Sequence, residues 1–183
     1  MKAIVLDKPF SNEDEYFLFE EKSELKHEYI NGTLFEMSGA SKFHNRLRRK
    51  IANLLDQLIN SGKFEVYDEG FKLRTPDGNF FYPDVLVCLT DPAFYYTDKP
   101  VLLVEVLSIS TRRFDLSDKF NQYSKLDTLE YYLCVEPQKK FIYFFYRDES
   151  NEWVTDEPYT EDTDIIHLPK LNISLAVKDI YTT

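Results

Sequence analysis

The chain has little of what flexible, zinc-bound or membrane-spanning proteins require. Its 183 residues contain five glycines, two cysteines and three histidines. So few glycines argue against long flexible stretches, and the lack of a Cys-x-x-Cys pair argues against a zinc site. No apolar run reaches the length of about 18 residues that a membrane span needs, so we expect no membrane partner.

Positive charge is scarce as well. Lysine and arginine total 22 against 32 acidic residues, which gives a formal net charge of −10. This balance excludes a general affinity for nucleic acid or for acidic membranes. Any binding of nucleic acid must therefore rest on positive charge gathered in one place.

The cysteines and the N-terminus indicate a cytoplasmic protein. Cys88 and Cys134 each lie in an apolar run, where cysteine behaves as a small buried apolar group. The opening MKAIVLDKPF is too short and too soon polar for a signal peptide. We therefore expect reduced thiols and a cytoplasmic location.

The chain does contain enough apolar material for one ordinary domain. Hydrophobic residues make up 43% of it and aromatic residues 16%. The sequence shows no internal repeat, no low-complexity segment and no linker. We therefore expect residues 1–183 to form a single domain.

Three helices are predicted from capping residues and from apolar side chains at helical spacing. Ser11, with Asp14 in capping-box position, is expected to cap the first, Ser41 the second, and Ser110 or Thr111 the third. The helices are expected over about residues 13–21, 42–60 and 112–126. The second has an apolar face of Phe43, Leu47, Ile51, Leu54, Leu55 and Leu58 and a basic face of Lys42, Arg46, Arg49 and Lys50.

The other segments alternate between strands and turns. Asn31-Gly32 predicts a hairpin, because both residues tolerate positive φ. FFYPDVLVCL (80–89) predicts a strand that runs through Pro83 or begins just after it. VLLVEVL (101–107) has the continuous apolar pattern of a central strand buried on both faces. Interleaved helices and strands indicate an α/β (α+β) class with a mixed sheet.

Glu105 is the most informative single residue. Burying an ionised carboxylate in an apolar strand costs a desolvation free energy on the order of several kcal/mol, unless a partner compensates the charge. The partner is either a basic side chain, a retained proton or a metal ion. A structural ion pair is the simplest alternative to a functional role.

Asp84 adds a second acid beside an apolar strand. It follows Pro83, which cannot donate to a sheet ladder and therefore suggests a bulge or an edge. Two such acids on separate strands can meet around a cation, and oxygen ligands without a His or Cys cluster favour magnesium or manganese. The alternative is that Asp84 only caps a turn.

The spacing of these acids resembles a known motif. Pro83-Asp84, followed 21 positions later by Glu105, is similar to the PD-(D/E)XK motif of restriction-endonuclease-like nucleases. The stretch 101–137, with its E-V-L-S, Ser-Thr and D-x-x-x-K-x-x-x-Y segments, resembles a restriction endonuclease family abundant in cyanobacteria. The N-terminal part fits this family through Glu28, Gly32, Gly39, Ala40, Ser41, His44 and Asn45. The similarity covers about residues 10–180 and implies a single nuclease-like domain, with a mixed β-sheet flanked by helices.

One position departs from the superfamily motif. Its lysine would stand at Leu107, two residues after Glu105 on the same strand face. The resemblance implies that Lys119, in the following helix, replaces it. Helical spacing allows this, because Asp115, Lys119 and Tyr123 follow one another at intervals of four. The alternative for Lys119 is a surface ion pair with Asp115.

Three further polar residues are candidates. His44 lies beside the apolar face of its helix, where the nuclease core usually contributes an active-site group; a hydrogen-bonded boundary histidine is the alternative. Glu28 and Glu36 stand eight positions apart in the predicted hairpin, so we expect them to share a face if no bulge intervenes. Either can complete a metal shell or remain solvated.

Basic side chains suitable for phosphate lie in two groups, for which a solvated helix face is the alternative interpretation. The aromatic runs AFYYT and FIYFFYR can stack bases, although core or dimer packing is commoner. The basic residues are Lys42, Arg46, Arg48, Arg49 and Lys50, with Arg112 and Arg113.

The resemblance implies a magnesium-dependent endonuclease. Asp84, Glu105 and the main-chain carbonyl of Val106 would hold Mg²⁺ or Mn²⁺, Lys119 would orient water or stabilise the transition state, and His44 would support the site. DNA is the expected nucleic acid, and a homodimer is a possible assembly. A catalytically inactive binding or regulatory module, favoured by Leu107 and the net charge, is the main alternative. An acidic nucleic-acid mimic is a third.

Overall fold

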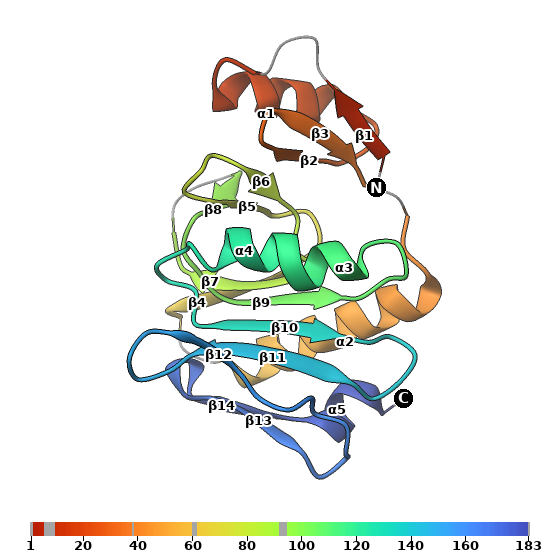
Figure 1. The fold of residues 1–183 in the computed structure, drawn as a ribbon, viewed down its shortest axis with the longest axis vertical. Coiled ribbons are helices and arrows are strands. Elements are labelled where there is room, and N and C mark those ends of the chain that lie inside the picture. Colours follow the sequence, from red (N-terminus) through yellow and green to blue (C-terminus); the bar gives the residue numbers. More distant parts are fainter. Residues whose placement is uncertain (1, 6–9, 38, 60–61, 92–94, 183) are drawn as a thin grey trace.

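The computed structural model describes residues 2–5, 10–37, 39–59, 62–91 and 95–182, and its elements form stacked layers (Figure 1). The first sheet has the order β1-β3-β2-β6-β5-β8 and the second the order β12-β11-β10-β9-β7-β4. The strands of the first are β1 (Lys2–Val5), β2 (His27–Ile30), β3 (Thr33–Glu36), β5 (Lys72–Arg74), β6 (Phe80–Phe81) and β8 (Tyr96–Thr97). The strands of the second are β4 (Phe64–Asp68), β7 (Val85–Leu89), β9 (Pro100–Val106), β10 (Tyr131–Val135), β11 (Ile142–Arg147) and β12 (Trp153–Thr155).

Among the remaining elements, α1 packs against the first sheet, whereas α2, α4, α5, β13 and β14 pack against the second. Strands β13 and β14 form a separate antiparallel pair, and Figure 1 shows α3 and α4 on the opposite side of the sheet from that pair. No helix among the described residues is long and apolar enough to cross a membrane. These elements are α1 (Glu13–Lys22), α2 (Lys42–Leu58), α3 (Arg112–Phe114), the π-helical η1 (Asp115–Lys119), α4 (Phe120–Tyr123), β13 (Ile165–Leu168), the 3₁₀ helix η2 (Pro169–Leu171), β14 (Ile173–Ala176) and α5 (Val177–Tyr181).

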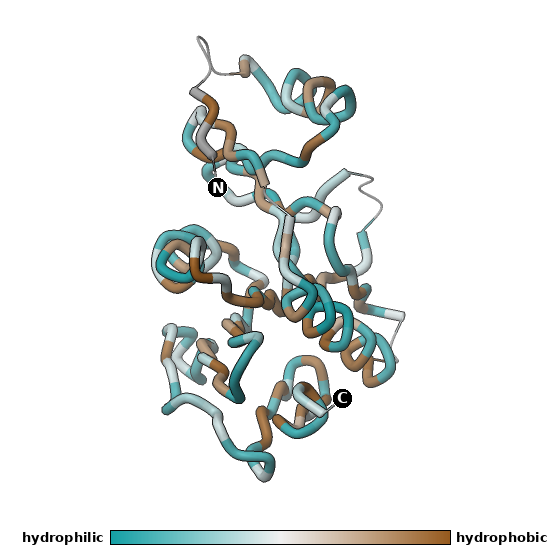
Figure 2. The backbone as a smooth tube through the Cα atoms, turned by 90° about the vertical axis from the view of Figure 1, so that its right-hand side faces the viewer, coloured by the Kyte–Doolittle hydropathy of each residue, from teal (hydrophilic) through white to brown (hydrophobic). Residues whose placement is uncertain are grey.

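Strand β9 is the central strand that the apolar run predicts. It pairs antiparallel with β7 and parallel with β10, and all seven of its residues are buried. Side chains alternate between its two faces. Leu102 and Val104 pack toward α2, α5, β13 and β14, whereas Leu103 lies in a second apolar cluster with residues of α4. Figure 2 shows the apolar segments gathered in the interior.

Of the two interpretations of residues 80–89, a strand running through Pro83 is wrong and a strand beginning just after it is confirmed, because the segment divides into β6 and β7 in two different sheets. Tyr82, Pro83 and Asp84 form the crossing between them. Proline interrupts ladder pairing here, but the register irregularity within β7 falls between Val87 and Cys88. Asp84 is therefore held at the point where the chain passes from one sheet to the other.

The N-cap residue agrees with the prediction in two helices of three. Ser41 caps α2 and accepts a hydrogen bond from the N–H of His44, as predicted. The cap of α1 is Asn12 instead of Ser11. Thr111 stands at the N-cap of α3, as predicted, but its side chain makes no cap hydrogen bond, and the Ser108 hydroxyl accepts from its N–H. The predicted third helix also contains the π-helical segment η1.

Helix α2 is shorter than predicted. It ends at Leu58, and Asn60 and Ser61 lie outside the described residues. Leu47, Ile51 and Leu55 are buried in the core, whereas Phe43 and Leu58, at the two ends of the predicted apolar face, are 47% and 40% exposed.

Candidate active site

Asp84 and Glu105 come together at one end of the second sheet. Val85 of β7 pairs with Val104 of β9, so one step further along the antiparallel pair Asp84 stands opposite Glu105. Side chains opposite one another in such a pair lie on the same face, with Cβ atoms about 5 Å apart. Asp84 Oδ2 also accepts a hydrogen bond of 2.8 Å from the main-chain N–H of Val106. The two acids that the sequence singles out are therefore neighbours.

Glu105 is buried and has two partners on one of its oxygens. The Lys119 amine donates to Oε1 at 2.9 Å, and the Tyr123 hydroxyl donates to the same atom at 3.0 Å. Both partners are buried, and they come from η1 and α4. Lys119 is therefore not in the surface pair that was its alternative interpretation, although Asp115 lies 3.7 Å from the amine.

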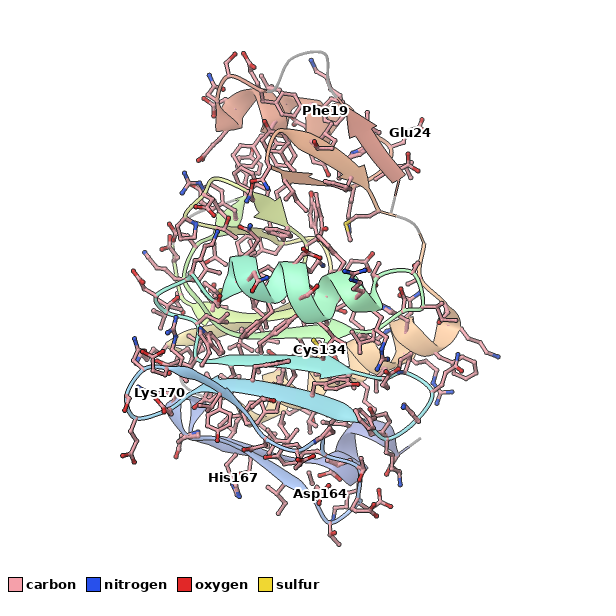
Figure 3. All side chains as sticks on the ribbon, in the orientation of Figure 1. Phe19, Glu24, Cys134, Asp164, His167 and Lys170 are labelled. Atoms are coloured by element: carbon pink, nitrogen blue, oxygen red, sulfur yellow. The ribbon has the colours of Figure 1, made fainter. Side chains whose placement is uncertain are left out.

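Leu107 occupies the place of the superfamily lysine and is itself buried. It lies in the apolar cluster that also contains Tyr132 and Cys134, and Figure 3 shows Cys134 inside the stack of layers. The amine next to Glu105 therefore comes from the helical segment after β9 instead of from β9 itself. The structure agrees on this point with the geometry that the resemblance implies.

Glu28 of β2 completes the surroundings of Lys119. Its Oε1 lies 3.1 Å from the lysine amine and accepts from the Tyr82 main-chain N–H, while its Oε2 is buried without a hydrogen-bond partner. Glu36 does not share this face, so that prediction is wrong. In the two-residue hairpin Glu28 pairs with Phe35, and Glu36 pairs with His27. The side-chain parity changes across such a turn, so an even spacing in sequence places the two residues on opposite faces.

His44 reaches the site from the first turn of α2. Its Nε2 lies 3.1 Å from Asp84 Oδ2. The other ring nitrogen, Nδ1, is buried without a hydrogen-bond partner. Because Ser41 fixes the start of the helix, it also fixes the position of this ring. His44 of α2 and the main-chain N–H of Val106 in β9 therefore hold the same oxygen of Asp84.

Burial and the neighbouring opposite charges shift the pKa values of this cluster in opposite directions. Burial raises the pKa of Glu105 well above its usual value, while Lys119 opposes that shift. Burial also raises the pKa of Asp115. For Lys119 burial works to lower the pKa, but Glu105 and Glu28 outweigh it and raise the pKa well above its usual value. Lys119 therefore stays charged, among more carboxyl groups than it can neutralise.

The donor atoms present fit a hard divalent cation. Both protein partners of Asp84 bind Oδ2, and both partners of Glu105 bind Oε1. One oxygen of each acid thus has no partner among the described residues. No group of three His, Cys, Asp or Glu side chains in the described part of the chain is already arranged as a metal site. A fit therefore needs two carboxylates, a main-chain carbonyl and water, which is the donor chemistry that Mg²⁺ and Mn²⁺ favour.

The acids open into a cleft of about 1300 Å³. Its wall includes the buried cluster and several basic residues from α2, α3 and the loop after β10. The structure divides the basic set that the sequence singles out. Arg48 is buried and paired with Glu69, and Arg112 is paired with Glu136, whereas Arg49 is exposed. Fewer cations are therefore free for phosphate than the sequence suggests.

Two hydrogen bonds of the site are not predicted from the sequence. The Tyr82 main-chain N–H that holds Glu28 has no side-chain signature, and it depends on the crossing between two sheets. The Tyr123 hydroxyl donates to Glu105, and the only sequence signal for this contact is the spacing of four residues between Tyr123 and Lys119.

The fold and these residues define a class of protein. A mixed α+β fold, with a mixed sheet flanked by helices and two acids at the end of an antiparallel strand pair, is of the restriction-endonuclease-like type. The chain belongs to the Uma2 family, described as "Putative restriction endonuclease", whose model matches residues 13–178. The fold class and the family resemblance are thereby confirmed.

Known relatives and a solved structure agree with this assignment. The uncharacterized proteins slr1290 and sll1609 of Synechocystis sp. PCC 6803 are 29% and 30% identical to this chain. The first match covers 94% of this chain and 92% of the relative, and the second covers 82% and 89%. A crystal structure of a "putative nuclease belonging to DUF820" from Anabaena variabilis superposes with a TM-score of 0.75 at 14% identity, covering 92% of this chain and 96% of that one. This likeness shows the fold.

Proposed function

We propose that this chain is a divalent-cation-dependent endonuclease that hydrolyses phosphodiester bonds in DNA. The observation that carries the proposal is the meeting of Asp84, Glu105 and Lys119 at the wall of one open cleft. These groups come from the crossing just before β7, from β9 and from η1. A purely structural ion pair would need only one acid and one base, and it would not need a cleft beside it.

The carboxylates of Asp84 and Glu105 and the carbonyl of Val106 would hold Mg²⁺ or Mn²⁺. Such an ion, when bound, lowers the pKa of a water molecule and stabilises charge on the phosphoryl oxygens. Tyr123 fixes the Glu105 carboxylate by donating to Oε1, and the main-chain N–H of Val106 fixes Asp84. Both acids are thereby held in place before a ligand arrives.

Lys119 and His44 supply the protein's other polar groups. The buried lysine amine keeps its charge and lies at the wall of the cleft, where it can bind a phosphoryl oxygen or orient the attacking water. The His44 ring holds Asp84 through Nε2. His44 acts on the reaction through Asp84 and is therefore a positioning residue.

The test compares Asp84→Asn and Glu105→Gln with the unaltered chain. Cleavage of supercoiled plasmid and of labelled DNA duplexes is measured with Mg²⁺, with Mn²⁺ and with chelator. We expect cleavage to fall at least about a hundredfold in each variant and to need the metal. Asp162→Asn is the matched control, because Asp162 pairs with Lys140 outside the cleft. Equal cleavage by all four proteins would overturn the proposal.

Metal binding gives a second measurement that does not depend on turnover. Titration calorimetry with Mn²⁺ should detect one site in the unaltered chain and in Asp162→Asn, and a strongly weakened one in Asp84→Asn. Circular dichroism checks that each variant is folded.

A second candidate function is a nuclease-fold module that binds nucleic acid without cleaving it. The observation that favours it is the direct pairing of Lys119 with Glu105, which occupies one oxygen of a proposed metal ligand. DNA binding by the unaltered chain, without cleavage under any metal condition, would favour this second function. The homodimer and the cytoplasmic location stay predictions.

A further inference from the structure

A second hollow lies beside the catalytic cleft on the exposed side of α2. Its volume is about 440 Å³, and α5 supplies one of its walls. Arg49 lines both hollows, so the two adjoin at this residue of the helix. In Figure 2, α2 and the neighbouring α5 face the viewer. The hollow is lined by Arg46, Arg49, Lys50, Asn53, Leu54, Gln57 and Asp179.

The charge of this hollow is opposite to that of the chain. It carries three basic side chains and one acid, whereas the whole protein has a net charge of −10. None of the described carboxylates forms an ion pair with Arg46, Arg49 or Lys50. Arg48, on the same helix, shows the contrast, because Glu69 neutralises it. The hollow therefore presents positive charge that the protein itself does not use.

The same residues form a stripe along α2. Five residues of the hollow, with Lys42 before them, are each three or four residues from another member of the set, which places them on one side of a helix. The stripe consists of Lys42, Arg46, Arg49, Lys50, Asn53 and Gln57. The stripe begins at the cleft, near His44, and extends for ~22 Å at 1.5 Å per residue. That length matches roughly six nucleotides of one DNA strand at about 3.4 Å each.

We propose that this stripe binds the phosphate backbone of a DNA strand that extends out of the catalytic cleft. The proposal rests on the proposed function, because the cleft defines where the strand begins. Arginine and lysine bind phosphate by charge, and asparagine and glutamine donate hydrogen bonds to its oxygens. These contacts carry no sequence information, so the stripe sets register and affinity instead of sequence preference.

The experiment replaces two basic residues that lie outside the cleft, in Arg46→Gln/Lys50→Gln. Binding of a labelled 20-nucleotide DNA, single-stranded and as a duplex, is measured in chelator at several salt concentrations. We expect the Kd to rise at least about tenfold near 0.1 M salt and the slope of log Kd against log salt to fall by roughly two. The matched control is Lys140→Gln/Lys170→Gln, exposed lysines outside both hollows, which should leave both quantities unchanged.

Two results would overturn the inference. One is a salt slope and Kd in the stripe variant equal to those of the control variant. The other is a change in sedimentation coefficient with no change in DNA binding, which would assign the stripe to an acidic protein partner such as a second copy of this chain. Because binding is measured in chelator, it is read independently of cleavage. Loss of cleavage in Asp84→Asn with DNA binding intact tests the proposed function alone.

Discussion

The two faces of the second sheet differ in what they bury. On one face Leu102, Val104 and Val106 of β9 pack against α2, α5, β13 and β14, and that core cluster consists of hydrophobic side chains. On the other face, the polar face, the same strand contributes Leu103 to a second apolar cluster and Glu105 to an ion pair with Lys119 of η1. One strand therefore serves both faces, with alternate residues in opposite roles.

The difference shows how stability and chemistry are separated. Apolar burial contributes about 25 cal/mol per Å² and depends little on direction. A buried ionic cluster contributes little net stability, and it becomes strongly unfavourable when one partner is lost. The apolar clusters on both faces can therefore carry the folding free energy, while the polar face also holds the charges that a pocket for metal and phosphate requires. The following predictions test this separation.

Lys119→Met should give the largest loss of stability. It removes the one lysine that faces Glu105, Glu28 and Asp115 and leaves their carboxyl groups buried without it. We expect the free energy of unfolding to fall by about 3–5 kcal/mol, measured by urea denaturation at neutral pH. Lys125→Met, which removes an exposed partner of Asp77, should change stability little.

A double-mutant cycle sharpens this result. Glu105→Gln should recover part of the stability lost in Lys119→Met, because it removes one of the unpaired charges. If the two losses simply add, or if Lys119→Met unfolds like Lys125→Met, the polar face is not the coupled cluster described above.

Leu102→Ala should have the next largest effect, on the apolar face. Leu102 is fully buried, so its truncation leaves a cavity that costs about 3 kcal/mol. Unlike the Lys119 variant, this one should keep its metal affinity and should not respond to substitution of Glu105. Leu18→Ala, at a half-exposed position in α1, should stay within about 0.5 kcal/mol of the unaltered chain. A matching loss of metal affinity in Leu102→Ala would show that the faces are not separate.

The buried strand β9 and the two main acids can be predicted from the sequence, for physical reasons. A carboxylate within VLLVEVL stands out because desolvation makes it costly, and Asp84 follows from its place beside Pro83. Lys119 required the family resemblance, since its spacing from Asp115 is equally typical of a surface ion pair.

The remaining features depend on contacts that are distant in sequence. The buried position of Glu28 depends on β2 pairing with β6, and its hydrogen bond comes from the main chain of Tyr82. The pairing of Arg48 with Glu69 likewise joins two segments 21 residues apart. No local pattern encodes these contacts, because they arise only when the two sheets have assembled.

Tyr123→Phe should have a smaller effect than either earlier substitution. It removes only the hydroxyl that donates to Glu105, while the ring keeps its edge-on contact with Phe81. A lost hydrogen bond to a buried charged group costs about 1.5–3 kcal/mol, and Lys119 remains as a partner, so we expect the lower end of that range. Thermal and urea denaturation measure the loss. Tyr95→Phe, at an exposed position, is the matched control, and an equal loss in both would remove Tyr123 from the cluster.

Asp115→Asn should give the smallest change, visible chiefly as a difference in pH dependence. Burial raises the pKa of Asp115 above its usual value of 3.8, so the folded state holds this proton more tightly than the unfolded state. The resulting contribution to stability is complete below about pH 3.8 and is lost as the pH rises through the raised value. Asparagine cannot ionise, so the variant should gain stability relative to the unaltered chain between about pH 4 and pH 7. Urea denaturation across that range measures the difference, and Asp162→Asn, at an exposed acid, should show none. A constant difference at every pH would mean that Asp115 keeps its usual pKa despite its burial.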